Sequence, residues 1–333
     1  MSQVQFPPAV SRRLPAYILL AVFAGLLAGT PAAAKKPRRD LKEPPTYADV
    51  AYGSDPKQRF DVYCPAGKGP FPVLFWVHGG GWFTGDKIPD TTEPESYLKA
   101  GVAVVSINYR LIGNAVAEKI LPPVTAVLGD ARRALQYCRL HAAEWRLDPD
   151  KIVVAGGSAG AASALYLACE GEQANAASAD PVERVSTKVL GAMAAIAQTS
   201  IDPEHTHEWN PGCDWGYWAC EPPAENKGGN MDLFNKYLAD RERWLPVIKS
   251  YSPEWLMTKE TPPIYFSYSQ PPPAPGTTPP SSALVHSPLW AIGFMKMAQE
   301  IGVKCYLQYP GHPVPEYKGG ASEFILRELG VKE

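Results

Sequence analysis

Residues 156–160 read Gly-Gly-Ser-Ala-Gly, a spacing in which a serine can act as a nucleophile. The apolar run Ile152–Ala155 precedes the serine and an alanine-rich apolar stretch follows it, so Ser158 is predicted to lie in a turn between a buried strand and a buried helix. So sharp a turn strains the backbone of Ser158, and glycines two positions away let strand and helix approach each other. The pattern therefore predicts a raised Ser158 hydroxyl, with the N–H of Ala159 at the start of a helix.

A second glycine-rich stretch, residues 78–82 (His-Gly-Gly-Gly-Trp), directly follows another apolar run. Glycines leave their backbone N–H groups unshielded, so Gly80 and Gly81 can point theirs, together with that of Ala159, at a developing oxyanion. His78 is predicted to order this loop by bonding to backbone, and Trp82 is predicted to form a wall of the substrate site.

These motifs resemble those of the α/β-hydrolase carboxylesterases. The segments that carry the likeness are HGGGWFTGDK (78–87), INYRL (107–111) and DPDKIVVAGGSAG (148–160), and the branch is similar to secreted feruloyl-esterase-like and acetyl-esterase-like proteins. The resemblance implies an eight-stranded, mainly parallel sheet and ester hydrolysis through an acyl-enzyme. It also implies a triad in the chain order serine, acid, histidine.

The resemblance places the general base after the last strand, where His312 follows the apolar run 303–309. His286 is the weaker candidate, because it lies just outside the expected start of a helix. The resemblance also implies an aspartate just after the expected strand 263–267. The chain departs from this pattern, because it has no Asp or Glu between Glu260 and Glu300.

Three explanations for the missing acid stay open. The acid could instead follow the strand before that one, 189–197. Asp202 lies shortly after this strand, and Glu204 in the same loop is the second choice. Alternatively His312 could be oriented by a backbone or amide group in a dyad, or the site could be degenerate. We favour Asp202, which should then lie within hydrogen-bond reach of His312.

The rest of the chain indicates the α/β class. Apolar runs expected as strands alternate with stretches expected as helices, which is typical of a mostly parallel sheet covered on both faces. The expected strands are 50–52, 60–63, 72–77, 102–108, 152–155, 189–197, 263–267 and 303–309. Ser287, Pro288 and Gly302 predict the start and end of a helix between the last two strands.

One insertion, about residues 199–261, interrupts this alternation between the sixth and seventh strands and holds five tryptophans. We expect most of them to pack in the insertion's own core and one or two to line the cleft. Cys213 and Cys220 enclose a short loop within it and are the likeliest disulfide pair in an exported protein.

The first 34 residues have the features of a signal peptide: Arg12 and Arg13, then an apolar stretch, then small residues up to Ala34. Residues 35–333 are predicted to form a single domain after cleavage near Ala34, secreted or periplasmic. The formal charge of −2 becomes −4 when these two arginines are removed, which argues against nucleic acid as a partner. No stable membrane anchor is expected.

The sequence therefore predicts a secreted serine esterase that needs no cofactor and no metal. Its substrate is expected to be a small-molecule ester or an acyl group on a polysaccharide. The contrasting hypothesis, motivated by the missing acid, is a degenerate hydrolase scaffold that binds a ligand or carbohydrate without catalysis.

Overall fold

The computed structural model describes residues 44–87, 94–222, 229–277 and 279–331. The expected signal peptide lies outside these residues. Within them, no helix is long and apolar enough to cross a membrane.

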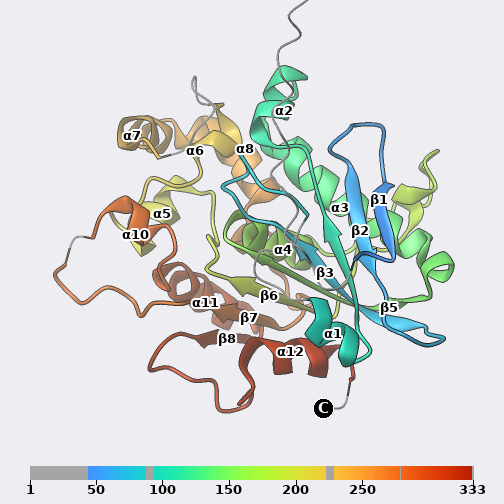
Figure 1. Cartoon of the computed structure of the whole chain (residues 1–333). Helices are drawn as coiled ribbons and strands as arrows, with labels where there is room; N and C mark the ends of the chain where they lie inside the picture. Colours follow the sequence, from blue (N-terminus) through green and yellow to red (C-terminus); the bar gives the residue numbers. More distant parts are fainter. Residues whose placement is uncertain (1–43, 88–93, 223–228, 278, 332–333) are drawn as a thin grey trace, which may run out of the picture. The chain divides into compact units, whose positions relative to one another are not determined.

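An eight-stranded sheet forms the centre of the fold, with strand order β1-β2-β4-β3-β5-β6-β7-β8 (Figure 1). β2 pairs antiparallel with β1 and β4, and all pairs from β4 to β8 are parallel. This confirms the predicted α/β architecture. The strands are β1 (Tyr47–Ala51), β2 (Arg59–Tyr63), β3 (Phe71–Val77), β4 (Ala103–Ile107), β5 (Leu147–Gly157), β6 (Gly191–Ala195), β7 (Ile264–Ser267) and β8 (Cys305–Gln308).

Helices cover both faces of the sheet because the central strands are apolar on both sides. In β3, Val73, Phe75 and Val77 join one buried cluster, while Leu74 and Trp76 join the other. The first cluster includes residues of α3, α4 and α11, and the second includes residues of α1 and α12. These helices are α1 (Pro94–Lys99), α3 (Val124–Leu140), α4 (Ala159–Cys169), α11 (Leu289–Ile301) and α12 (Gly320–Glu328); α2 (Ile112–Ala117) follows β4.

The start and end of α11 are as the sequence predicts. Pro288 has helical backbone angles directly before Leu289, the Ser287 hydroxyl accepts a hydrogen bond from the Leu289 N–H, and Gly302 ends the helix in a left-handed conformation. This placement matters because His286 lies just before the helix.

The segment between β6 and β7 contains the predicted tryptophan-rich insertion. Trp215 and Trp218 are buried in the same cluster as α3 and α4, Trp209 and Trp244 pack against it, and Trp255 is exposed, so the tryptophans join the main core and not a separate core of the insertion. It folds into α5 (Pro203–Trp209), α6 (Tyr217–Cys220), α7 (Met231–Ala239), α8 (Arg241–Tyr251) and α9 (Pro253–Leu256), and the short α10 (Ser281–Leu284) follows β7.

The predicted disulfide between Cys213 and Cys220 is wrong. Both are free and buried, and the Cys220 thiol lies 3.2 Å from the Tyr237 hydroxyl. Each cysteine therefore serves as a small core residue.

Candidate active site

Ser158 occupies the turn between β5 and α4 with φ 54° and ψ −126°, a conformation that a side chain rarely adopts. A Cβ at Gly156 would overlap the Gly160 carbonyl, and one at Gly160 would overlap the Val77 carbonyl at the end of β3. The glycines are therefore required for the close approach of helix and strands. This is the strained turn that the spacing predicts.

Backbone strain is shared by the neighbouring strand end. Ile196 directly follows β6 with φ 45°, which is exceptional for a β-branched residue. The Ser158 N–H donates to the Ala195 carbonyl at 2.8 Å, and the Ile196 N–H donates to the Ser267 carbonyl at 2.7 Å. These bonds from β5 to β6 to β7 hold the strained turn in place. Strain maintained in this way is typical of functional sites.

The histidine beside the nucleophile is His286, whose Nε2 lies 2.9 Å from the Ser158 Oγ. It follows α10, in the loop between β7 and α11. Burial lowers the pKa of His286 below its ordinary value, which favours the neutral imidazole that can accept a proton. The sequence analysis ranked His286 second because of its place before a helix, and this geometry reverses the ranking.

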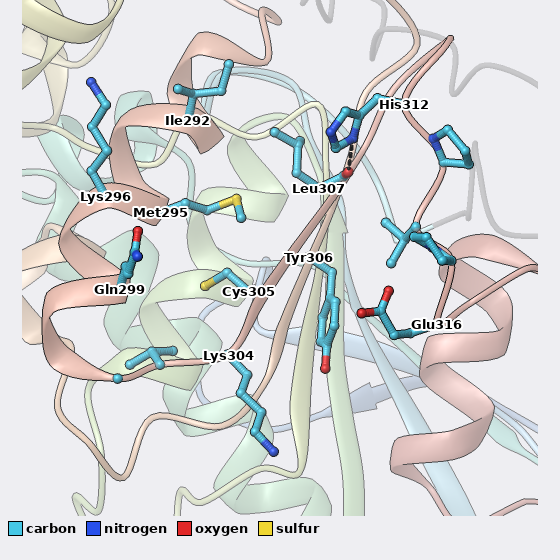
Figure 2. Close-up of a pocket in the computed structure, with 15 residues that line it drawn as sticks. Ile292, Met295, Lys296, Gln299, Lys304, Cys305, Tyr306, Leu307, His312 and Glu316 are labelled. Atoms are coloured by element: carbon cyan, nitrogen blue, oxygen red, sulfur yellow. Dashed lines mark hydrogen bonds between the residues drawn. The ribbon is translucent and has the colours of Figure 1, made fainter.

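His312, the predicted base, is not brought to Ser158. Its imidazole is exposed, its Nδ1 donates to the Leu307 carbonyl at 2.9 Å, and its ring stacks on Tyr309 with centroids 4.7 Å apart. His312 lines a groove of about 730 Å³ beside the edge strand β8 and α11 (Figure 2). Neither Ser158 nor His286 lines this groove. The turn Tyr309–His312 closes on itself through two backbone hydrogen bonds, which holds the ring against its own strand.

Asp202, the predicted acid, is fully buried and engaged elsewhere. Its carboxylate caps α5 by accepting from the Glu204 N–H at 3.0 Å, and accepts from the Arg241 guanidinium at 2.7 and 2.6 Å and from the Trp255 indole at 3.1 Å. Burial raises the pKa of Asp202, but the Arg241 hydrogen bonds, the Glu204 N–H and the nearby charges of His205 and Arg241 together outweigh burial and leave the pKa below its usual value. The predicted contact with His312 is absent, because Asp202 joins α5, α8 and α9.

Glu204, the second choice for the acid, does not contact a histidine of the site either. It is exposed and pairs with Arg241 at 3.0 Å. Within the described residues no carboxylate forms a hydrogen bond or ion pair with His286, whose pKa is shifted by burial alone. The geometry is therefore that of a serine–histidine dyad. A dyad was one of the alternatives left open by the sequence, but with His312 in the place that His286 takes.

The glycine loop after β3 lies beside the nucleophile. A Cβ at Gly79 would stand 3.4 Å from the Ser158 Cβ, and Gly80 and Gly81 have φ of 103° and 65°. Within the described chain the N–H groups of Gly81 and Ala159 form no hydrogen bond, so both donors are available to a ligand. Their role at an oxyanion stays a prediction.

His78 orders this loop, as predicted. Its Nδ1 donates to the Gly79 carbonyl at 2.8 Å, its ring stacks on Tyr109, and the Tyr109 hydroxyl donates to the His78 carbonyl at 2.8 Å. The ring also lies where a Cβ at Gly85 would be, which ties the two ends of the loop together.

Trp82 is a core residue, which corrects its predicted place as a wall of the site. It is 1% exposed, its indole N–H donates to the Ser163 hydroxyl at 3.0 Å, and its ring packs on Trp215. The next residue, Phe83, is half-buried and contacts Trp218, and a Cβ at Gly81 would lie 3.5 Å from its ring. Phe83 therefore places a half-buried aromatic ring beside Gly81.

Comparisons with known proteins agree with this fold. The family model described as BD-FAE matches residues 60–270. The versiconal hemiacetal acetate esterase of Dothistroma septosporum is 34% identical over 128 residues, which make up 36% of this chain and 35% of that protein. The matched parts are about a fifth to a third of the length of the curated relatives.

Solved structures resemble a larger part of the chain. A truncated carbohydrate esterase from gut microbiota covers 85% of this chain and 96% of its own, with a TM-score of 0.61 and 17% identity. An acetyl ester-xyloside bifunctional hydrolase from Caldicellulosiruptor lactoaceticus covers 82% of this chain and 88% of its own, with a TM-score of 0.57 and 17% identity. At such low identity this likeness concerns the fold.

Proposed function

The chain belongs to the BD-FAE family, and we propose that it is a serine carboxylic-ester hydrolase with Ser158 as nucleophile and His286 as general base. The observation that carries the proposal is the 2.9 Å contact between Ser158 Oγ and His286 Nε2 at a strained strand-to-helix turn. A nucleophile and a base within hydrogen-bond reach are the signature of covalent acyl transfer.

In the proposed mechanism the Ser158 O–H donates to Nε2, so the neutral imidazole carries its proton on Nδ1. Oγ attacks the acyl carbon as Nε2 takes the proton, and the imidazolium then protonates the leaving alcohol. Water, activated by the same imidazole, releases the acid from the acyl-enzyme. The N–H groups of Gly81, Ala159 and Gly80 stabilise the oxyanion, each contributing roughly 3–4 kcal/mol to barrier lowering.

A non-catalytic ligand-binding scaffold is the second candidate. One observation favours it: no carboxylate of the described chain contacts His286, so an imidazolium lacks the stabilisation that a triad acid gives. Against it stand the strained serine and the N–H groups of Gly81 and Ala159, which form no hydrogen bond within the described residues and which a binding scaffold does not need.

For the substrate we propose a small acyl ester, carried by a polysaccharide or by a small molecule. Phe83 beside Gly81, backed by Trp218, offers an aromatic surface to an acyl group held in the oxyanion site. The similar carbohydrate esterase and acetyl ester-xyloside hydrolase support the polysaccharide option by fold likeness. We also propose that the protein is exported and that residues 1–34 are removed as a signal peptide.

The test uses the mature chain with p-nitrophenyl acetate and a fluorophosphonate probe. Turnover, together with a phosphonate adduct that mass spectrometry locates on Ser158, is the expected result. A folded protein that neither hydrolyses the ester nor reacts with the probe would instead favour the ligand-binding scaffold.

A further inference from the structure

Two buried amides hold the segment that carries His286. The Gln198 Nε2 donates to the Val285 carbonyl at 2.5 Å, and the Asn210 Nδ2 donates to the Leu284 carbonyl at 2.7 Å. Both side chains are fully buried. We call Gln198 and Asn210 the amide clamp.

The clamped carbonyls belong to the two residues directly before His286. The clamp therefore fixes the backbone from which the imidazole projects. The neighbouring Thr199 hydroxyl extends this attachment, because it donates to the Trp290 carbonyl in the first turn of α11 at 2.9 Å. His286 is thus held on both sides by residues that follow β6.

Ser158 is attached to the same strand end. Its N–H donates to the Ala195 carbonyl, three residues before Gln198. The nucleophile and the base, which are 128 residues apart in the chain, are therefore both positioned by the segment 195–199. A displacement of about 1 Å between reacting groups can lower a rate by about 10²-fold, so this shared attachment bears directly on catalysis.

The clamp retains its amides at a cost. The Gln198 Oε1 and the Asn210 Oδ1 are buried without a hydrogen-bond partner in the described chain. An unpaired buried acceptor destabilises a fold, and a leucine of similar size would avoid this destabilisation. What leucine cannot supply is the N–H donor to the carbonyls beside His286.

We propose that Gln198 and Asn210 are positioning residues that keep His286 aligned with Ser158 in place of a triad carboxylate. The inference rests on the proposed function. A triad acid both orients the histidine and stabilises the imidazolium. The clamp supplies orientation through the backbone, which explains how the segment 261–299, which holds no Asp or Glu, can dispense with an acid.

The alternative is that these amides only stabilise the fold. Gln136 provides a matched control, because it is also a buried glutamine whose Nε2 donates to two backbone carbonyls, those of Val185 and Glu183 at 2.7 and 3.3 Å. It lies on α3 and contacts neither Ser158 nor His286.

The experiment compares Gln198→Leu, Asn210→Leu and Gln136→Leu by ester kinetics and by urea unfolding. We expect Gln198→Leu to lower kcat by about 10²-fold at nearly constant KM, and Asn210→Leu to do so less strongly. Gln136→Leu should lower the unfolding free energy while keeping kcat. Folded Gln198→Leu and Asn210→Leu proteins with the parent's kcat would overturn the proposal.

Gln198→Met adds a variant of similar size that lacks the Nε2 donor to the Val285 carbonyl. Its kcat should fall at nearly constant KM, a split that a loss of stability alone would not produce. The parent's kcat in the folded variant contradicts the positioning role. Parent protein without turnover or phosphonate labelling would instead refute the proposed function, and the clamp with it.

Discussion

Two loops after neighbouring strands each carry a histidine, and only one brings its imidazole to the nucleophile. After β7, His286 lies 2.9 Å from Ser158 on a segment held by buried amides. After β8, His312 closes a tight turn and bonds to the carbonyl of Leu307 in its own strand. The comparison teaches that the packing around a loop decides which histidine can act as the base. A position after the last strand, as His312 has, is not sufficient.

The largest loss of activity is expected for Ser158→Ala, which removes the hydroxyl oxygen that His286 contacts. Turnover of p-nitrophenyl acetate should fall by about 10⁴-fold or more, and phosphonate labelling should disappear. The circular dichroism spectrum should match that of the parent. A variant that keeps its turnover would mean that neither histidine loop serves this serine.

Gly81→Val leaves both histidine loops intact and disturbs only the oxyanion donors. Gly81 has φ 65°, a left-handed conformation that a β-branched valine rarely adopts, so the loop must shift. We expect kcat to fall by about 10²-fold, the scale of one lost donor. Gly101→Val is the control, because Gly101 also has positive φ but open space around it. Equal kcat in both variants would place the oxyanion site elsewhere.

The pH profile distinguishes a histidine without an acid from one with an acid. Burial lowers the pKa of His286, so the neutral base should persist below the ordinary pKa of about 6.5. The kcat/KM of the parent should therefore rise with pH to a plateau, with a midpoint below this value. A midpoint above 7 would indicate a carboxylate partner for the base.

Asp202→Asn separates stability from catalysis. The substitution weakens the buried pair with Arg241, so the unfolding free energy should fall by about 3 kcal/mol while kcat stays near that of the parent. The folded pKa of Asp202 is depressed, so its stabilisation is present above the unfolded pKa of about 4 and is lost as pH falls through the folded pKa. Urea unfolding at several pH values measures both. A loss of kcat without a loss of stability would restore Asp202 as the acid.

The sequence predicted the features that local sterics determine. The Ser158 turn, the glycine loop and the limits of α11 each follow from glycine, proline and capping residues within a few positions. The base could not be predicted in this way, because the contact between Ser158 and His286 joins residues 128 positions apart. The lack of acidic residues between Glu260 and Glu300 was the available signal that this loop works differently.

The remaining misassignments have the same origin. Asp202 was chosen for its distance from a strand end, but its surroundings are set by Arg241 and Trp255 from distant helices. Trp82 was placed at the site by its motif, whereas packing on Trp215 buries it.

The central claim is that His286, and not His312, is the base, and the kcat of two matched variants tests it most directly. His286→Gln should lower kcat by about 10³–10⁴-fold, because the amide cannot take the Ser158 proton. His312→Gln should leave kcat within about twofold of the parent, because its ring is exposed and bonds to Leu307 and stacks on Tyr309 without reaching Ser158. Full activity in folded His286→Gln, or its loss in folded His312→Gln, would contradict the account.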